Sequence, residues 1–481
     1  MTLLQVFETT VVLSLLLVVA GAVRRLYFHP LAHIPGPRLA AITWWYEFYF
    51  DVIQPSTFVF KIQELHKQYG PIVRITPDEI HVNDVGFLET IYAPSMFHRD
   101  KYGYILRTLR IPGAIGAIVR HDVHRKRREV LGPFFSKRNV LHLEPPDQQK
   151  AREIVVTNNF LFAHQTDVLA GETLAATLRQ NGNDLLLGIN INKHFPWFPD
   201  FLESLPLFIS KPIMPPGLVD MLALFDRVRA ELQTGIVAAK SSCISSEKQL
   251  GPTGKESVYH SVLDSNVLPP EEKSLLCLEQ EGALLAELST VPKTASWSEL
   301  EKLPYLSAVL EEGNRLSWGV TARTARIADE TLKYTPSAYA ASPGKSYAIP
   351  PGTPISTTTL SAHTAESVFP EPFTFDPERW LGDAGSERRK FQMAFGKGER
   401  KCIGIELARA ELYLVTAALI RGFEMELWET DESEVAFVHD YQVAMPEFGS
   451  KGAMNTRGGL AHGQGPGPQD ASNAANNGAG E

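Results

Sequence analysis

One cysteine lies in a glycine-bracketed loop near the end of this 481-residue chain, within the sequence FGKGERKCIG at residues 395–404. A helical pattern follows Cys402 and runs from Gly404 to Ile420, with Gly422 as its stop. The thiolate is the form of cysteine that binds metals, and the positive end of the following helix helps to keep the sulfur ionised. Gly398 and Gly404 let the backbone approach a bound group closely and adopt conformations that a Cβ would forbid. The loop therefore predicts a metal–thiolate site that the rest of the fold must hold in place.

These ten residues resemble the haem-binding signature of the cytochrome P450 family, Phe-x-x-Gly-x-Arg-x-Cys-x-Gly, at every specified position. The resemblance implies a haem b cofactor with Cys402 as the axial iron ligand and catalytic residue, and such a thiolate favours O–O cleavage. Phe395 is expected to shield the sulfur from water and Arg400 to pair with a haem propionate. Gly398 and Gly404 complete the cofactor-binding positions of the loop. The alternative interpretation is a buried cysteine in a glycine-rich loop.

Two further motifs precede the cysteine in the order that the family shows. Glu312 and Arg315 stand three residues apart, which places them on one face of a helix. Arg379 follows in an aromatic segment, Phe373-Thr-Phe-Asp-Pro-Glu-Arg-Trp380. The resemblance implies that Glu312, Arg315 and Arg379 form a buried structural triad that fixes the cysteine loop against the core. Exposed, solvated charges are the alternative.

A basic helix is predicted over residues 122–135 and carries His124 and Arg128 four residues apart. These two match the Trp/His-x-x-x-Arg pattern whose residues bind a haem propionate in the family. The alternative for this basic run is a solvated or reductase-facing surface. Arg323 and Arg326 stand where the family often has a further propionate contact, but neither is assigned that role here.

The predicted fold is mainly α with a small β region, similar to the cytochrome P450 fold. Residues 71–76 and 79–83 alternate like paired strands around a Thr-Pro-Asp turn, and short strands return between residues 325 and 358. Residues 132–137 and 192–200 resemble fungal members of the trichodiene-oxygenase type. This resemblance implies a small apolar substrate, a secondary metabolite such as a terpenoid or a polyketide-like compound.

The N-terminus predicts a membrane anchor over residues 1–25. Leu3 to Val23 is apolar except for one charge, Glu8, and a few uncharged polar residues, and about 20 predominantly apolar residues span a bilayer as a helix. Arg24 and Arg25 follow directly, which favours a cytoplasmic position for the rest of the chain. A cleaved signal peptide is the alternative, because Ala20-Gly-Ala resembles a cleavage site. The family implies a single pass through the endoplasmic reticulum membrane.

The anchor is followed by a predicted haem-thiolate catalytic domain over residues 26–449 and a disordered, low-complexity tail over residues 450–481. The net charge of −9 argues against nucleic acid as a partner. The family implies instead that an NADPH-cytochrome reductase supplies electrons.

The chain departs from the family pattern on the side of the haem opposite the thiolate. The family carries an Ala/Gly-Gly-x-Asp/Glu-Thr pattern there, on a long central helix several dozen residues before the Glu-x-x-Arg motif. In this chain that place holds a short helical pattern between Glu271 and Leu288. Its two ends resemble the ends of two different helices, which predicts a truncated central helix and an internal deletion near residues 282–284. Ala170-Gly-Glu-Thr173 has the right letters but lies too early in the chain order.

These patterns together predict a haem-dependent monooxygenase. The main alternative is a degenerate haem protein, or one with an incomplete deduced sequence, that lacks monooxygenase activity. A haem-thiolate isomerase or dehydratase that needs no reductase is a third possibility. The shortened distal segment is the feature on which the choice depends.

Overall fold

A computed structural model describes residues 2–107, 114–141, 189–206, 297–340, 343–427 and 435–447, together with Ser210, Ser433, Ser450 and the strand Thr456–Leu460. Besides the pattern at residues 271–288, the sequence has helical patterns at residues 150–190 and 221–240, and all three lie wholly or almost wholly outside these ranges. The predicted deletion near residues 282–284 and nearly all of the predicted tail also lie outside them, as do Cys243 and Cys277.

A five-stranded sheet is the centre of the β region, with the strand order β1-β2-β7-β4-β3. Its strands are β1 (Ile72–Arg74), β2 (Ile80–Val82), β3 (Arg99–Lys101), β4 (Arg326–Ala328) and β7 (Pro354–Ser356). The β1–β2 hairpin confirms the predicted pair of strands, with Ile72 opposite Val82. The pairing of β2 with β7 is parallel and the other pairings are antiparallel. The sheet therefore joins strands from residues 72–101 with strands from residues 326–356.

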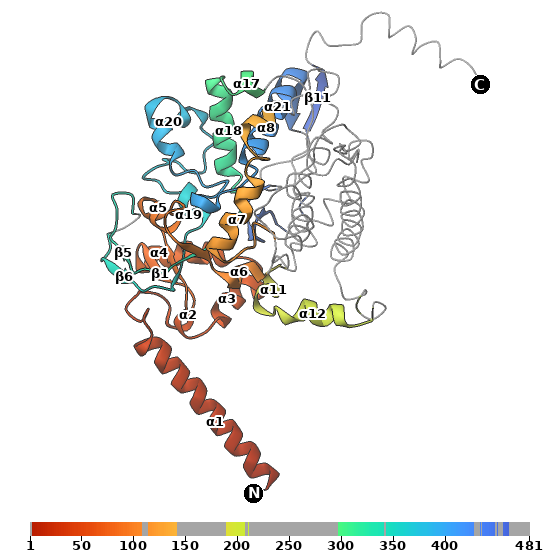
Figure 1. Cartoon of the computed structure of the whole chain (residues 1–481). Coiled ribbons are helices and arrows are strands. Elements are labelled where there is room, and N and C mark those ends of the chain that lie inside the picture. The colour runs from red at the N-terminus through yellow and green to blue at the C-terminus, as the bar shows by residue number, and fades with distance from the viewer. Residues whose placement is uncertain are drawn as a thin grey trace, which may run out of the picture.

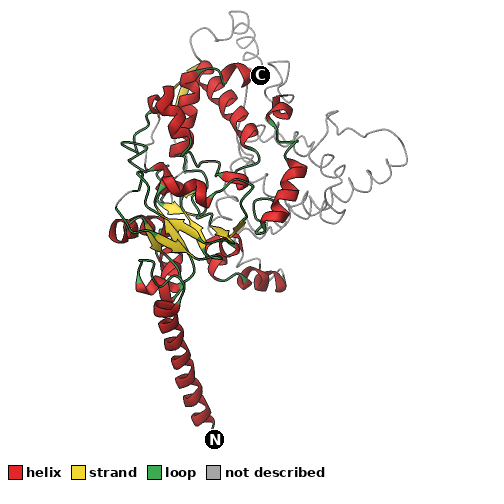
Figure 2. Ribbon diagram, turned by 60° about the vertical axis from the view of Figure 1, so that its left-hand side comes forward, coloured by secondary structure: helices red, strands yellow, loops and turns green. Residues whose placement is uncertain are grey.

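Three smaller antiparallel pairs complete the strands: β5 (Leu332–Tyr334) with β6 (Tyr347–Ile349), β8 (Phe423–Leu427) with β11 (Thr456–Leu460), and β9 (His439–Asp440) with β10 (Ala444–Met445). The described part is mainly helical around this small β region, which agrees with the predicted fold class (Figure 2).

Most helices of the first part of the chain lie near the sheet, but α8 (Lys137–Leu141) lies toward the end of the described part opposite the N-terminal helix (Figure 1). The helices of this first part are α2 (Arg38–Ile42), α3 (Trp45–Phe48), the π-helix η2 (Tyr49–Ile53), α4 (Phe58–Tyr69), the 3-10 turn η3 (Val85–Phe87), α5 (Leu88–Ile91), α6 (Gly103–Leu106), α7 (His121–Leu131), α8, α11 (Ile189–His194) and α12 (Trp197–Ser204).

The later helices lie at the end of the described part opposite α1 (Leu3–Val23), except α19, which lies nearer the sheet (Figure 1). They are α17 (Trp297–Leu300), α18 (Pro304–Leu316), α19 (Thr359–His363), the 3-10 turn η6 (Pro377–Trp380), α20 (Gly382–Arg389), the 3-10 turn η7 (Gly398–Arg400) and α21 (Ile405–Gly422). Helix α21 packs against α8, α17 and α18. The main core cluster extends from the sheet to Ala308 of α18 and Trp380 of η6.

The sequence also has helical patterns over residues 44–69 and 297–315, and each is broken in the structure by a proline. The helical pattern of residues 297–315 is two helices, because Pro304 can begin a helix but cannot continue one. The pattern of residues 44–69 is also interrupted, at Gln54-Pro55 between η2 and α4. The predicted basic helix is α7, and it ends at Leu131 before Gly132-Pro133.

The N-terminal helix α1 projects away from the rest of the protein (Figure 1). It continues as a π-helix, η1, over Arg24–Phe28, so one continuous helical stretch of 26 residues is long and apolar enough to cross a membrane. The side chains of its central residues are exposed. Arg74 joins this stretch to the first hairpin, since its Nη1 donates to the Arg25 carbonyl over 3.0 Å.

Candidate active site around Cys402

The cysteine loop is held by backbone hydrogen bonds and two left-handed glycines. The Cys402 amide donates to the Phe395 carbonyl over 2.8 Å, which folds the loop back on itself. Gly396 and Gly398 have φ values of +70° and +67°, a conformation that favours glycine. The Cys402 side chain is exposed, and α21 begins three residues later at Ile405. The loop thus presents its sulfur close to the positive end of a long helix.

The two glycines named from the sequence have different structural roles. A Cβ on Gly398 would lie 2.2 Å from the Tyr92 carbonyl oxygen, so the loop packs backbone against backbone there. Gly404 is not among the positive-φ glycines, so the expectation that both glycines adopt conformations forbidden to a Cβ is wrong for this one. A Cβ on Gly404 would only contact the Cys402 sulfur at 4.0 Å. Gly396 is the left-handed position that the sequence argument missed.

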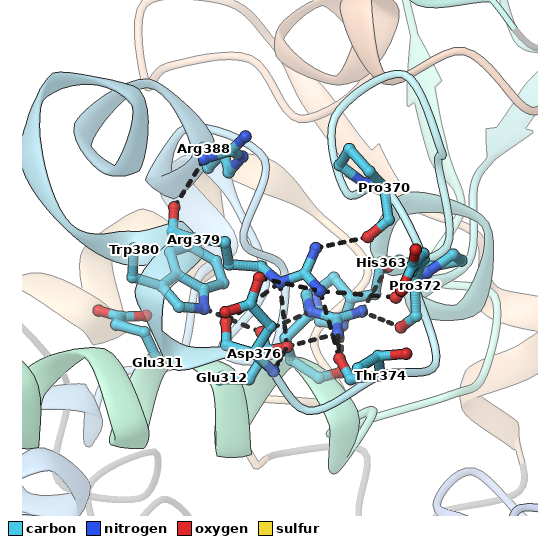
Figure 3. A network of polar contacts seen from close by, with 12 residues as sticks. Glu311, Glu312, His363, Pro370, Pro372, Thr374, Asp376, Arg379, Trp380 and Arg388 are labelled. Atoms are coloured by element: carbon cyan, nitrogen blue, oxygen red, sulfur yellow. Dashed lines mark hydrogen bonds and ion pairs between the residues drawn. The ribbon is translucent and has the colours of Figure 1, made fainter.

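Glu312 forms ion pairs with both Arg315 and Arg379 in the core. Figure 3 shows Glu312 and Arg379 within this network. Arg315 donates to both carboxylate oxygens of Glu312 over 2.8 Å, and Nε of Arg379 lies 3.1 Å from Glu312 Oε1. Trp380 donates from its indole nitrogen to Oε2 over 2.9 Å. Glu312 and Arg315 are fully buried. The Glu312 pKa lies below its usual value, because its hydrogen bonds with Arg315, Asp376 and Trp380 outweigh a large opposing effect of burial.

The arginines of this triad also hold the segment that leads to the cysteine loop (Figure 3). Arg315 donates to the carbonyls of His363 and Pro372 over 2.9 and 2.5 Å, and Arg379 donates to the Pro370 carbonyl over 2.8 Å. Gln392 donates to the Glu311 carbonyl over 3.0 Å. The triad therefore ties α18 to residues 363–379, and the separate bond from Gln392 links α18 to the chain immediately before the loop, two contacts that the motif spacing did not reveal.

His124, Arg128 and Arg400 lie together between α7 and the cysteine loop. Arg400 donates to the carbonyls of Ile118 and Val119 over 2.8 and 3.1 Å. Arg128 donates to the Lys401 carbonyl over 2.7 Å, next to the cysteine. Burial and the charge of Arg400 lower the pKa of His124 to about 2. The structure thus brings the three residues predicted as propionate contacts into one electropositive region.

Two more cations belong to this region. Lys101 on β3 pairs in register with Arg326 on β4, so two like charges are directly opposite each other. Burial, followed by the charges of Arg326 and Arg400, lowers the pKa of Lys101 well below its usual range. Burial also lowers the Arg326 pKa. Lys101 had no sequence signal, because only the pairing of distant strands places it beside Arg326.

The residues of this region fit the two carboxylates of a haem. Nδ1 of His124 and Nε of Arg400 are buried and have no hydrogen-bond partner within the described part of the chain. Among the described residues, no carboxylate forms an ion pair with Lys101, Arg326 or Arg400. An anion placed among them would satisfy these donors and remove their mutual repulsion. A thiolate-bound haem requires one cysteine sulfur for its iron and cationic groups for its two propionates, and this region has both.

Arg323 has a different role from its neighbour Arg326. Its Nε lies 3.1 Å from Oε1 of Glu79 and its Nη2 lies 2.5 Å from Oε1 of Glu47. Both carboxylates are fully buried. Arg323 is therefore neutralised by protein groups and has no charge left for a cofactor.

Comparisons with known proteins give a consistent result. The profile of the family described as Cytochrome P450 matches residues 281–449. Cytochrome P450 monooxygenase tpcC of Cochliobolus heterostrophus is 31% identical, and the alignment covers 89% of this chain and 93% of that protein. Cytochrome P450 monooxygenase TRI4 of Trichoderma arundinaceum is 30% identical over 88% of this chain and 90% of that protein.

Two further comparisons extend this similarity. Conidiogenone synthase PchP450 of Penicillium rubens is 32% identical, with 88% of this chain and 93% of that protein covered. Among solved structures, retinoic acid bound cyanobacterial CYP120A1 superimposes with a TM-score of 0.56 at 18% identity, covering 83% of this chain and 94% of that one. The structural likeness concerns the fold alone.

Proposed function

The chain belongs to the cytochrome P450 family, and from this premise we propose that it is a haem b monooxygenase that oxidises an apolar secondary metabolite, a terpenoid or a polyketide-like compound. Its fungal relatives are cytochrome P450 monooxygenases, and one of them is named as a conidiogenone synthase. The observation that carries the proposal is the buried cation region of His124, Arg400 and their neighbours beside Cys402. An NADPH-cytochrome reductase is the proposed electron donor.

The proposed roles of the loop residues follow from their positions. Cys402 would supply the axial thiolate, kept ionised by Arg128 and by the N-terminal end of α21. Arg400, His124 and Arg128 would hold the propionates, with Lys101 and Arg326 as additional cations. A haem held in this way would supply the chemistry for inserting one atom of dioxygen into a C–H or C=C bond, while the other atom leaves as water with two electrons from the reductase and two protons.

The remaining predicted residues support the loop. Gly398 would allow the loop to lie against the Tyr92 backbone. Gly404 would leave room beside the Cys402 sulfur, because a Cβ added to Gly404 would lie 4.0 Å from that sulfur. Phe395, which is partly buried, would limit access of water to the thiolate. Glu312, Arg315 and Arg379 would keep the preceding segment rigid.

We also propose that residues 1–25 anchor the protein in the endoplasmic reticulum membrane by a single pass, with residues 26–449 as the cytoplasmic catalytic domain. The exposed apolar helix and the arginines at its end support this arrangement. The hydrogen bond from Arg74 to the Arg25 carbonyl ties the end of this helical stretch to the first hairpin.

A degenerate haem protein without monooxygenase activity is the second candidate. The alignment with tpcC extends over 504 positions, more than the 481 residues of this chain, so that relative has residues without a counterpart here. The sequence feature that favours this candidate is the short helical pattern between Glu271 and Leu288.

The ferrous–carbon monoxide difference spectrum of the full chain tests the proposal. A red-shifted Soret band that disappears in Cys402→Ser is the expected result, and NADPH-dependent turnover with a reductase would then separate the two candidates. A wild-type protein that binds no haem would overturn the proposed function.

A further inference from the structure

One aromatic ring covers the guanidinium of Arg326 in the cation region beside Cys402. The Arg326 Cζ lies over the Tyr92 ring, 4.9 Å from the ring centroid. Both residues are at most 5% exposed. A cation over the face of an aromatic ring is attracted by the ring quadrupole, and the attraction is larger when water is excluded from the contact. The ring therefore holds the arginine in place without cancelling its charge.

The nearby Arg323 shows how an arginine of this segment is neutralised. Its Cζ also lies 4.9 Å from an aromatic centroid, that of Phe58. In addition it forms ion pairs with two buried carboxylates, Glu47 and Glu79. Arg326 has the same kind of ring contact, but no carboxylate in the described part of the chain pairs with it. Of these two arginines, only Arg326 keeps a charge that it can offer to an anion.

The remaining contacts of Arg326 leave part of its guanidinium open. Nη1 donates to the carbonyls of Thr324 and Ala325 over 2.5 and 3.4 Å. Within the described ranges, Nε and Nη2 make no hydrogen bond. Lys101 faces Arg326 in register on β3, so a second positive charge acts against this position. Without the ring, little would fix the direction in which the guanidinium points.

Tyr92 also borders the cysteine loop through its main chain. A Cβ on Gly398 would lie only 2.2 Å from the Tyr92 carbonyl oxygen. The Tyr92 hydroxyl donates to the Thr357 carbonyl over 3.3 Å and accepts from the Thr324 hydroxyl over 3.4 Å, both long for hydrogen bonds between oxygens. The ring belongs to the main core cluster, so packing holds it more than its hydroxyl does. One residue thus contacts both the loop of the proposed iron ligand and a cation proposed for a propionate.

We propose that Tyr92 is a positioning residue for the cofactor, whose ring holds Arg326 in place to bind a haem propionate. The inference rests on the proposed function, since it needs a haem bound to Cys402. The ring would act through the arginine, by keeping its charge directed at the propionate against the repulsion from Lys101.

The test measures how fast the full-length haem protein loses haem to an acceptor protein, after the ferrous–carbon monoxide spectrum of each variant has been recorded. Tyr92→Leu removes the ring, whereas Tyr92→Phe keeps the ring and removes only the hydroxyl. Phe58→Leu is the matched control, because it removes a buried ring that lies at the same 4.9 Å from an arginine already neutralised by carboxylates. Tyr92→Leu is measured a second time in combination with Arg326→Met.

Tyr92→Leu should lose haem about tenfold faster than the wild type, as expected for the loss of a desolvated cation–π contact. Tyr92→Phe and Phe58→Leu should lose haem at the wild-type rate. Added to Arg326→Met, the change Tyr92→Leu should accelerate the loss by less than about twofold, because the ring acts through the arginine.

Three results overturn the inference. The first is a wild-type rate of haem loss in Tyr92→Leu. The second is the same acceleration with and without Arg326→Met, because Tyr92 would then support the fold and not the arginine. The third is an equal acceleration in Tyr92→Phe or Phe58→Leu, because the contact between ring and cation would then not be the cause.

A variant with an unnatural residue covers the case in which Tyr92→Leu does not fold. Pentafluorophenylalanine at position 92 keeps the shape of the ring and removes the negative charge of its face. Faster haem loss than in Tyr92→Phe is expected, and an equal rate overturns the inference.

The two proposals fail in different ways. A wild-type spectrum without the red-shifted Soret band overturns the proposed function and this inference with it. A normal wild-type spectrum combined with haem loss that does not depend on the ring overturns only the inference.

Discussion

The amide of Met393 donates a hydrogen bond to Nε2 of His363 over 2.9 Å, two residues before the cysteine signature begins. The other ring nitrogen, Nδ1, lies 2.8 Å from the Arg315 carbonyl and must donate to it. These two bonds define a neutral imidazole with its proton on Nδ1. One buried ring thus connects the ion triad to the loop of Cys402.

Acid should loosen this connection. Burial lowers the pKa of His363 to about 3 from an unfolded value of 6.5, so the unfolded chain binds more protons between these values. The contribution of His363 to stability is therefore complete above pH 6.5 and declines as the pH falls toward 3, by about 1.4 kcal/mol per pH unit.

The variant His363→Gln isolates this contribution, because its amide can make both hydrogen bonds and does not titrate. Urea unfolding at pH 7 and pH 5 should show a smaller loss of stability for the variant than for the wild type. His66 and His124 have lowered pKa values in both proteins, so only the difference between the two is informative. Identical pH dependence would refute the role of His363.

The triad should be necessary for a haem-loaded protein. Glu312→Ala leaves Arg315 buried without its bidentate partner, which costs about 3–5 kcal/mol and frees the segment before the loop. We expect no haem-loaded protein from Glu312→Ala or Arg315→Ala, measured as Soret absorbance per purified chain. Glu311→Ala is the neighbouring control, because its closest basic partner, Arg409, is 3.9 Å away. Normal haem content in Glu312→Ala would count against the triad.

Local spacing explains what could be predicted from the sequence. Glu312 and Arg315 are three residues apart on a helix, so their contact follows from helix geometry alone. The β1–β2 hairpin and the helix after Cys402 were also predictable, because turn residues and glycine mark their ends. Contacts that depend on distant segments were not. His363 reaches Met393 and Lys101 faces Arg326 only because the fold brings together parts of the chain with no common pattern.

Lys101→Met should affect the apoprotein and the haem protein in opposite directions. Removing one of the facing cations relieves the repulsion with Arg326 and Arg400, so the apoprotein should unfold at a higher temperature. The same change removes a charge that would attract a propionate, and a charged contact is worth about 1.5–3 kcal/mol, so haem should be lost to an acceptor protein tenfold faster or more.

Lys137→Met is the control for these two opposite effects on apoprotein stability and haem retention, since Lys137 pairs with Glu301 over 2.6 Å at the surface. The control should change the free energy of unfolding of the apoprotein and the free energy of haem binding by less than about 1 kcal/mol each. If Lys101→Met destabilised the apoprotein and left haem retention unchanged, Lys101 would be a structural residue and not part of an anion site.

Gly398→Ala should displace the cysteine loop, whereas Gly382→Ala should be tolerated. Both glycines have φ values near +65°, at +67° and +63°, so an added Cβ costs both about 1–2 kcal/mol of backbone strain. Only at Gly398 would the Cβ also meet backbone, the Tyr92 carbonyl oxygen at 2.2 Å, while nothing lies within 4 Å at Gly382. The backbone cannot rotate away as a side chain can, so the loop itself must move. The unfolding midpoints of the two variants report the backbone strain that they share. The Soret band reports displacement of the cysteine loop, which is expected only in Gly398→Ala. An intact thiolate spectrum in Gly398→Ala, equal to that of Gly382→Ala, would show that the contact with Tyr92 does not position Cys402.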